Sequence, residues 1–162
     1  MTEVKKIMDT KLFHTDDNEI AEAGEILRNG GLVAFPTETV YGLGASAFDS
    51  DAAKKIYAAK GRPSDNPLIV HICDKGQIKD IAEEIPESAK KVIDNFMPGP
   101  VTIILKKKSV VPNDVTAARD TVAIRFPLHE TAQKLIKAAG VPIAAPSANL
   151  SGKPSPTKAK HV

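Results

Sequence analysis

Short apolar runs alternate with segments of helical spacing along this chain, and no other feature of the sequence restricts the fold as much. The apolar runs have the length of strands and lie at residues 32–35, 67–72, 101–105, 121–125 and 141–145. Twelve prolines and ten glycines are spread along the chain, which favours short elements joined by sharp turns over a helical bundle. The alternation predicts one α/β or mixed α+β domain of three layers, in which helices flank a twisted, open, mixed or mostly parallel sheet.

The helical segments begin at capping residues and end at glycines, which is typical of helices in small domains. Asp16 and Asp17 precede the first segment, which closes before Gly30. Ser50 is the expected cap of the second segment, which stops at Gly61. The second and later helices are predicted at residues 51–60, 75–84, 86–96 and 130–139, and residues 109–120 are predicted to form a loop.

The loop after the first strand is unusually polar for a turn between two elements. Pro36 ends the strand, and the residues that follow are Thr37, Glu38, Thr39, Val40 and Tyr41. Gly42 and Gly44 come next, and glycine permits positive φ or a close approach of a ligand to the backbone. Hydroxyl groups and bare backbone suit a small polar ligand, with the glycines as a flexible floor. An ordinary turn after a strand is the alternative, and this stretch alone does not decide between the two.

Polar side chains also follow three other predicted strands. His71 and Arg125 end two of them, and the segment Ser147-Ala148-Asn149 follows the last. Because ligands gather at the carboxyl ends of strands in open α/β sheets, we expect these clusters and the Pro36 loop to face one cavity. A histidine inside an apolar strand needs a partner, and both a core partner and a ligand remain open for His71.

Composition excludes several classes of function. The formal charge of +2 is too small to argue by itself for a nucleic-acid or membrane partner. A single cysteine, Cys73, excludes an internal disulfide and a zinc site of paired cysteines, and the scattered histidines form no metal motif. The N-terminus lacks an apolar signal segment and no run is long enough to cross a bilayer, so a cytoplasmic protein without membrane contact is predicted.

Five motifs, taken together and in this order, resemble the YrdC/TsaC family. They are residues 36–43 (PTETVYGL), 60–68 (KGRPSDNPL), 98–102 (PGPVT), 124–127 (IRFP) and 147–152 (SANLSG). The resemblance implies a single YrdC-like domain over residues 1–162 that lacks the C-terminal part of the family domain, with a concave electropositive cavity. It also implies L-threonylcarbamoyladenylate synthase activity, which joins L-threonine, bicarbonate and ATP for the threonylcarbamoyladenosine modification of tRNA.

The resemblance also implies roles for individual residues. Threonine contacts are implied for Thr39, His71, Arg125 and the backbone at Ala145. ATP contacts are implied for Arg62, Asn66, Thr121, Ser147 and Ser155, and catalytic roles at the phosphates or carbamate for Lys60 and Arg62. Further contacts are expected at Pro36, Tyr41, Asn149 and Ser151. Mg²⁺ is expected to bridge the phosphates, with no metal ligand from the protein.

Two alternatives remain beside this function. The first is a YrdC-like module that binds tRNA or double-stranded RNA through its cavity and through lysines 106–108, 153, 158 and 160. The second is the carbamoyl-adenylate-forming domain of hydrogenase-maturation carbamoyltransferases. Those proteins carry cysteine-rich zinc modules, which the single cysteine of this chain does not match. For the main function, proteins that transfer the threonylcarbamoyl group are the expected downstream partners.

Overall fold

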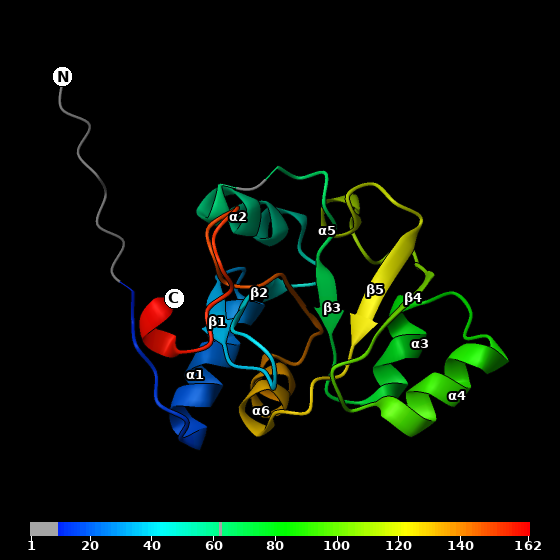
Figure 1. The fold of residues 1–162 in the computed structure, drawn as a ribbon, viewed down its shortest axis with the longest axis horizontal. Coiled ribbons are helices and arrows are strands. Elements are labelled where there is room, and N and C mark those ends of the chain that lie inside the picture. Colours follow the sequence, from blue (N-terminus) through cyan, green and yellow to red (C-terminus); the bar gives the residue numbers. More distant parts are fainter. Residues whose placement is uncertain (1–9, 62) are drawn as a thin grey trace.

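The computed structural model describes residues 10–61 and 63–162. Its helices are α1 (Asp17–Arg28), α2 (Ser50–Lys60), α3 (Ile78–Ile81), α4 (Glu87–Phe96), α5 (Asn113–Thr116) and α6 (Glu130–Ala139), with 3₁₀ turns η1 (Lys75–Gln77) and η2 (Ala159–His161) (Figure 1). Its strands are β1 (Val33–Phe35), β2 (Gly42–Ser46), β3 (Ile69–His71), β4 (Thr102–Lys106), β5 (Thr121–Arg125) and β6 (Ile143–Ala145).

The six strands form one open sheet in the order β1-β2-β6-β3-β5-β4. Strands β3 and β5 are parallel, with His71 opposite Arg125, whereas the other neighbours pair antiparallel. The predicted mixed sheet is therefore confirmed.

The pleat of the sheet directs side chains into two hydrophobic cores, one on each face. Val70 and Ile124 face the larger core, where they meet buried side chains of α2, α3, α4 and α5. Ile143 and Ala145 face the other core, which also holds Phe35 and the apolar sides of α1 and α6. Figure 1 shows α1 and α6 together beside β1 and β2. The three-layer arrangement is thus confirmed at this end of the sheet.

Close packing of α1 on α6 depends on Gly24. A Cβ atom at that position would lie 2.7 Å from the carbonyl carbon of Ala138, a distance that packed atoms do not reach. Arg28 in the last turn of α1 then donates hydrogen bonds to the carbonyls of Ala138 and Ala139. Those carbonyls belong to the end of α6, where they have no partner within the helix.

Local sequence signals place several helix ends correctly. The Asp16 carboxylate caps α1 by accepting hydrogen bonds from the amides of residues 18 and 19. The C-cap of α2 is Gly61 at φ 57°, a left-handed conformation that glycine adopts without strain. The expected cap at Ser50 is wrong by one residue, because the side chain of Asp49 accepts from the amide of Ala52 and Ser50 begins the helix.

Three predicted elements differ from the structure. The helix expected over 75–84 is a 3₁₀ turn followed by the short α3, which ends at Ile81. The expected loop over 109–120 contains the one-turn α5. Gly42 and Gly44 lie in β2 rather than in a flexible loop floor. A Cβ at Gly44 would lie 2.9 Å from the Phe35 ring and 2.7 Å from Ile143 Cγ2, so the glycine makes room for the core under α1.

Among the residues that the structure describes, no helix combines the length and the apolar character that crossing a membrane would require.

Candidate active site

Part of the sheet face that carries α1 and α6 is open to solvent. The two helices pack over β1, β2 and β6, whereas β4 and β5 extend beyond them (Figure 1). Ile104 in the middle of β4 is 69% exposed. On β5, Thr121, Ala123 and Arg125 point to this open face because Val122 and Ile124 point to the larger core. The strand register places His71 and Ala145 on the same face.

The loop between β1 and β2 is held in one shape by the hydroxyl of Thr37. Its Oγ1 accepts hydrogen bonds from the amides of Thr39 and Val40, each at 3.2 Å, and donates to the Val40 carbonyl at 2.7 Å. It also lies 3.1 Å from Oγ1 of Thr39. A threonine that bonds to the backbone of its own turn fixes that turn without help from a sheet. The loop therefore presents Glu38 and Thr39 in defined positions.

Glu38 and Thr39 both contact Arg125 at the end of β5. Nη2 of Arg125 donates to Oγ1 of Thr39 at 3.1 Å and lies 2.9 Å from Oε1 of Glu38. The side chains of Arg125 and Glu38 are only 12% and 19% exposed. Arg125 thus joins two segments far apart in the sequence, and it does so at the open face of the sheet.

Arg125 and Glu38 carry opposite charges in a partly buried environment, and their proximity keeps the Glu38 carboxylate ionised. Burial is the largest single influence and would raise the pKa of Glu38. The nearby Arg125 guanidinium, together with the backbone amides close to the carboxylate at Glu38 and Leu128, outweighs burial and leaves the pKa of Glu38 below its usual value. The carboxylate is therefore ionised at neutral pH.

His71 is buried beside this pair, opposite Arg125 in the parallel ladder. Its ring meets the Phe35 ring edge-on at 5.7 Å, and Nδ1 lies 3.0 Å from the carbonyl oxygen of Ile69. Burial and then the Arg125 charge lower the pKa of His71 to about 4, against weaker opposite effects of the Ile69 and Ile143 carbonyls and of Glu38. His71 is consequently neutral at pH 7, and its Nδ1–H donates to Ile69.

Lys60, Ser147, Asn149 and Ser151 form a second group, around the loop that follows β6. The buried Lys60 ammonium donates to the backbone carbonyls of Ser147 and Asn149, and the Lys60 carbonyl accepts from the amide of Ser151 at 3.0 Å. The Asn149 amide bonds to the carbonyls of Leu150 and Lys153, each at 2.9 Å. Lys60 therefore fastens this loop to the end of α2.

The remaining predicted residues are dispersed. Thr121 is half-buried on the open face, Asn66 and Ser155 are exposed on loops, and Ala145 is buried in β6. Arg62, for which both ATP contact and catalysis were predicted, lies outside the described residues.

The two groups are not arranged as the sequence predicted, because the strand ends do not meet at one edge. Strand β6 runs antiparallel to β3, so β3 and β5 end at one edge of the sheet. The pairings through β2 make β1 parallel to β6, and these two strands end at the opposite edge. The four carboxyl ends therefore do not lie at one edge of the sheet, as the prediction assumed. The loop between β1 and β2 spans the distance, because its Thr39 reaches Arg125 at the end of β5.

Tyr41 and Pro36 line a different cavity, of about 910 Å³ and mostly apolar, beside α1 and β1. The Tyr41 backbone nevertheless connects the two loops, since its amide donates to the carbonyl of Pro156 at 2.9 Å and its carbonyl accepts from the amide of Ala148 at 2.8 Å. Among the described residues, no hydrogen bond joins Tyr41 or Pro36 to Arg125 or His71, so their expected role at the polar site stays a prediction.

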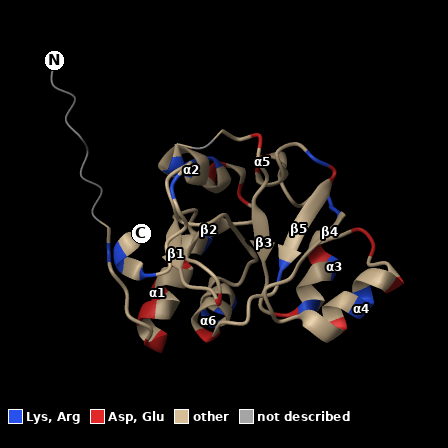
Figure 2. Cartoon of the chain, viewed as in Figure 1, with Lys and Arg blue, Asp and Glu red and all other residues tan. Residues whose placement is uncertain are grey.

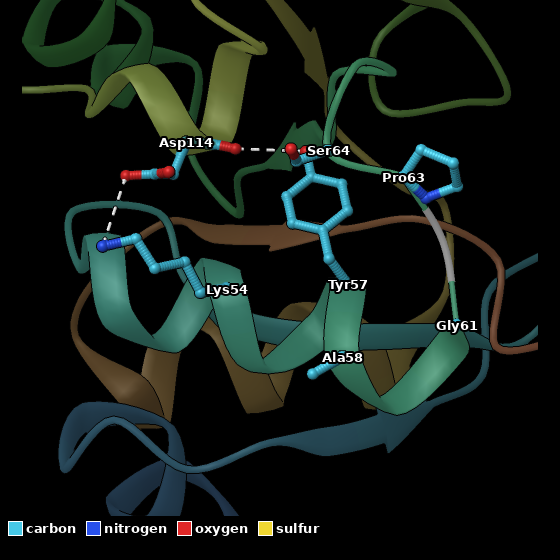
Figure 3. A pocket seen from close by; sticks show the side chains of 7 residues that line it. All are labelled: Lys54, Tyr57, Ala58, Gly61, Pro63, Ser64 and Asp114. Atoms are coloured by element: carbon cyan, nitrogen blue, oxygen red, sulfur yellow. Dashed lines mark hydrogen bonds and ion pairs between the residues drawn. The ribbon is translucent and has the colours of Figure 1, made fainter.

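A smaller, open pocket of about 650 Å³ lies on the outer side of α2. Figure 3 shows its Lys54 and Asp114 pointing toward each other, at 3.9 Å, and the Tyr57 hydroxyl donates to the backbone carbonyl of Asp114 at 3.1 Å. These polar groups already have partners in the protein. The open face of the sheet is therefore the better candidate for a functional site.

Glu38 is the member of the site that sequence reasoning did not assign. It belongs to the motif that carries the resemblance, and the available signal was an acidic residue between two threonines directly after a buried strand. For metals, no cluster of three or more His, Cys, Asp and Glu side chains occurs in residues 10–61 and 63–162.

Comparison with known proteins gives a consistent result. The Sua5/YciO/YrdC family model, described as telomere recombination, matches residues 25–162. The threonylcarbamoyl-AMP synthase of Bacillus subtilis is 60% identical over 154 residues, covering 94% of this chain and 44% of that protein. The protein of the same name from Pyrococcus abyssi is 58% identical over 144 residues, covering 89% of this chain and 42% of that protein.

A solved structure, that of P. abyssi Sua5 complexed with L-threonine, has a TM-score of 0.89 to this fold. It is 56% identical in sequence, and the match covers 90% of this chain and 43% of that one. The chain thus spans less than half the length of these relatives.

Proposed function

The chain belongs to the Sua5/YciO/YrdC family, and on that premise we propose that it forms threonylcarbamoyl-AMP and pyrophosphate from L-threonine, bicarbonate and ATP. One observation supports this proposal above the others: Arg125 and Thr39 meet at an open sheet face in a chain 56% identical to a protein solved with L-threonine. A guanidinium is the side chain best suited to a carboxylate, because its N–H groups match the carboxylate oxygens in a plane.

In this proposal the amino acid lies on the open face of the sheet. Arg125 binds its carboxylate, and the Thr39 hydroxyl and the backbone at Ala145 complete the pocket. His71 is neutral at pH 7 because its pKa is lowered to about 4, so it adds no charge that would repel an amine. Its role is to present an uncharged ring and to maintain the local backbone through Ile69.

ATP extends from this pocket toward the loop after β6. We assign its contacts to Arg62, Asn66, Thr121, Ser147 and Ser155, with Asn149 and Ser151 as additional wall residues. We assign to Lys60 a role at the phosphates or carbamate that it exerts through the loop held by its ammonium. Mg²⁺ accompanies the phosphates, where it neutralises charge, and the protein supplies cations and hydroxyls rather than a carboxylate cage.

The proposed chemistry has two stages. The threonine amine attacks the carbon of bicarbonate, forming the N–C bond of a carbamate and releasing water. A carbamate oxygen then attacks the α-phosphorus of ATP, and the bond from that phosphorus to the bridging oxygen of pyrophosphate breaks. Most of the rate enhancement comes from positioning and from cations that offset the repulsion among carboxylate, carbamate and phosphates.

The product would serve proteins that transfer the threonylcarbamoyl group to tRNA. A function limited to RNA binding has less support, because three of the lysines proposed for it, residues 106–108, have partners in the protein. Lys106 pairs with Glu83 at 3.0 Å, and Nζ of Lys107 donates to the Val111 carbonyl at 2.7 Å. Figure 2 shows basic and acidic residues interspersed along the helices and loops of the described chain.

Incubation of the chain with ATP, Mg²⁺, bicarbonate and labelled L-threonine, followed by chromatography, tests the proposal. We expect labelled threonylcarbamoyl-AMP and an equal amount of pyrophosphate, both dependent on bicarbonate. Arg125→Ala should form no product, and Arg119→Ala, an exposed arginine on a loop, should match the wild type. Absence of product from the wild type, with threonine and ATP both failing to bind, would refute the proposal.

A further inference from the structure

Glu38 stands out as a partly buried charge that the proposed reaction does not yet use. Its side chain is 19% exposed, and the nearest cation is Nη2 of Arg125, 2.9 Å from Oε1. Within the described residues, neither carboxylate oxygen of Glu38 has a partner that meets hydrogen-bond geometry. Buried carboxylates are normally satisfied by several donors, so a poorly satisfied one calls for an explanation.

The arginine of this pair is equally incomplete. Nη2 contacts both Glu38 and Thr39, whereas the buried Nε has no hydrogen-bond partner in the part of the chain that the structure describes. A guanidinium carries five N–H donors in a fixed plane. Glu38 and Thr39 therefore hold Arg125 by one nitrogen and leave donors for a second carboxylate.

The backbone alone does not fix the guanidinium, because an arginine side chain has several rotatable bonds beyond its Cα. Glu38 and Thr39 supply the missing restraint, and both belong to the turn that the Thr37 hydroxyl closes. The restraint is rigid because these bonds lie within one short loop. The Thr37 hydroxyl thus holds the loop, the loop orients Arg125 through Glu38 and Thr39, and Arg125 orients the ligand.

We propose that Glu38 is the positioning residue for Arg125 in binding the carboxylate of the amino acid. It holds the guanidinium on the open face of the sheet and does not contact the reacting atoms. This inference rests on the proposed function, because it assigns the carboxylate of L-threonine to Arg125. It adds to that function a residue for which no role was predicted.

The proposal distinguishes positioning from simple competition. If Glu38 merely competed with the substrate for Arg125, its removal would tighten threonine binding, because the guanidinium would lose a rival carboxylate. If Glu38 positions Arg125, its removal weakens threonine binding, because the free guanidinium samples several orientations. The sign of the change in affinity therefore separates the two roles.

The test is titration calorimetry of the full chain with L-threonine, L-threoninamide and ATP. Threoninamide keeps the amine and hydroxyl but lacks the carboxylate charge.

For Glu38→Gln we expect the threonine affinity to fall about tenfold, the loss of one charge-assisted contact. ATP affinity should stay within about twofold, and the preference for threonine over threoninamide should shrink. Glu38→Asp, which keeps the charge on a shorter side chain, should recover part of that preference. Glu87→Gln, which removes the acid of an exposed pair on α4, is the matched control and should change nothing.

Each result decides between the proposals. A general folding defect would weaken ATP and threoninamide along with threonine and would count against positioning, as would equal or tighter threonine binding by Glu38→Gln. If the wild type binds no threonine, the proposed function fails and this inference fails with it. If the wild type binds threonine and Glu38→Gln binds it equally well, only the inference fails.

Discussion

Two cations of this chain, the buried Lys60 and the partly buried Arg125, have opposite relations to their surroundings. The Lys60 ammonium donates to two backbone carbonyls of the loop after β6, so its contacts are directed at the protein itself. Arg125 contacts an acid and a hydroxyl through one nitrogen, and Nε has no hydrogen-bond partner among the residues described. The first arrangement stabilises a loop, and the second leaves donors for a ligand.

This difference teaches that residue type does not reveal which cation binds a substrate. Both residues lie in motifs of the same family and both are largely buried. Their unused donors separate them, because a buried cation that is fully paired gains little from a ligand, whereas one with open donors gains a charge-assisted bond. We therefore expect substitutions of Lys60 to act first on stability, and those of Arg125 to act first on binding.

Lys60→Ala gives the largest expected effect. It leaves the carbonyls of Ser147 and Asn149 without their donor, and the free energy of unfolding should fall by about 4 kcal/mol, for two hydrogen bonds to a charged group. Urea unfolding followed by circular dichroism measures this change. Lys54→Ala, on the same helix but with a 58% exposed side chain, should cost less than about 1 kcal/mol. Full stability with lost product formation would mean that Lys60 acts on the ligand rather than on the loop.

His71 makes stability depend on pH. Its folded pKa of about 4 is below the ordinary value of 6.5, so the unfolded state binds more protons between these values. The contribution of neutral His71 to the free energy of unfolding is complete above pH 6.5 and is lost as the pH falls toward 4. This loss is roughly 3 kcal/mol as an upper limit. Urea unfolding at pH 7.5, 6 and 5 measures the slope. His71→Gln should reduce the slope of unfolding free energy against pH, whereas His161→Gln, at an exposed site, should leave it unchanged. A slope in His71→Gln equal to that of the wild type would contradict the role of His71 in this pH dependence.

Arg125→Ala tests the other side of the comparison. The affinity for L-threonine should fall about 100-fold, since the carboxylate loses charge-assisted hydrogen bonds in a partly buried site. Calorimetric titration measures this affinity, and the affinity for ATP serves as an internal control. Wild-type threonine affinity in this variant would overturn the comparison, because Arg125 would then be structural like Lys60.

Thr37→Val gives the smallest effect. The change removes the hydroxyl that closes the loop, so Glu38 and Thr39 lose their fixed positions while every group that contacts Arg125 remains. We expect threonine affinity to fall about fivefold, the equivalent of roughly one neutral hydrogen bond. Thr37→Ser keeps the hydroxyl and should bind threonine nearly as well as the wild type. Equal binding by Thr37→Val would show that the loop is held by other contacts.

Much of the fold could be predicted from local signals. The bounds of β5 (Thr121–Arg125) and α6 (Glu130–Ala139) match the prediction, because alternation, helical spacing and glycine caps act within one element. Strand β2 was missed, since its glycines resemble a loop until Phe35 and Ile143 occupy the space beside them. The same limit explains the four strand ends, whose directions depend on pairing between distant segments.

The sequence by itself determined the alternating elements, the mixed sheet between helices, and the motifs that carry the family. The tertiary structure decided which polar groups meet. It placed Glu38 beside Arg125 and directed the Lys60 ammonium to the backbone carbonyls of the loop after β6. The reason is physical: a helix or strand is encoded by neighbours along the chain, whereas the partner of a buried charge is fixed only by strand order and register.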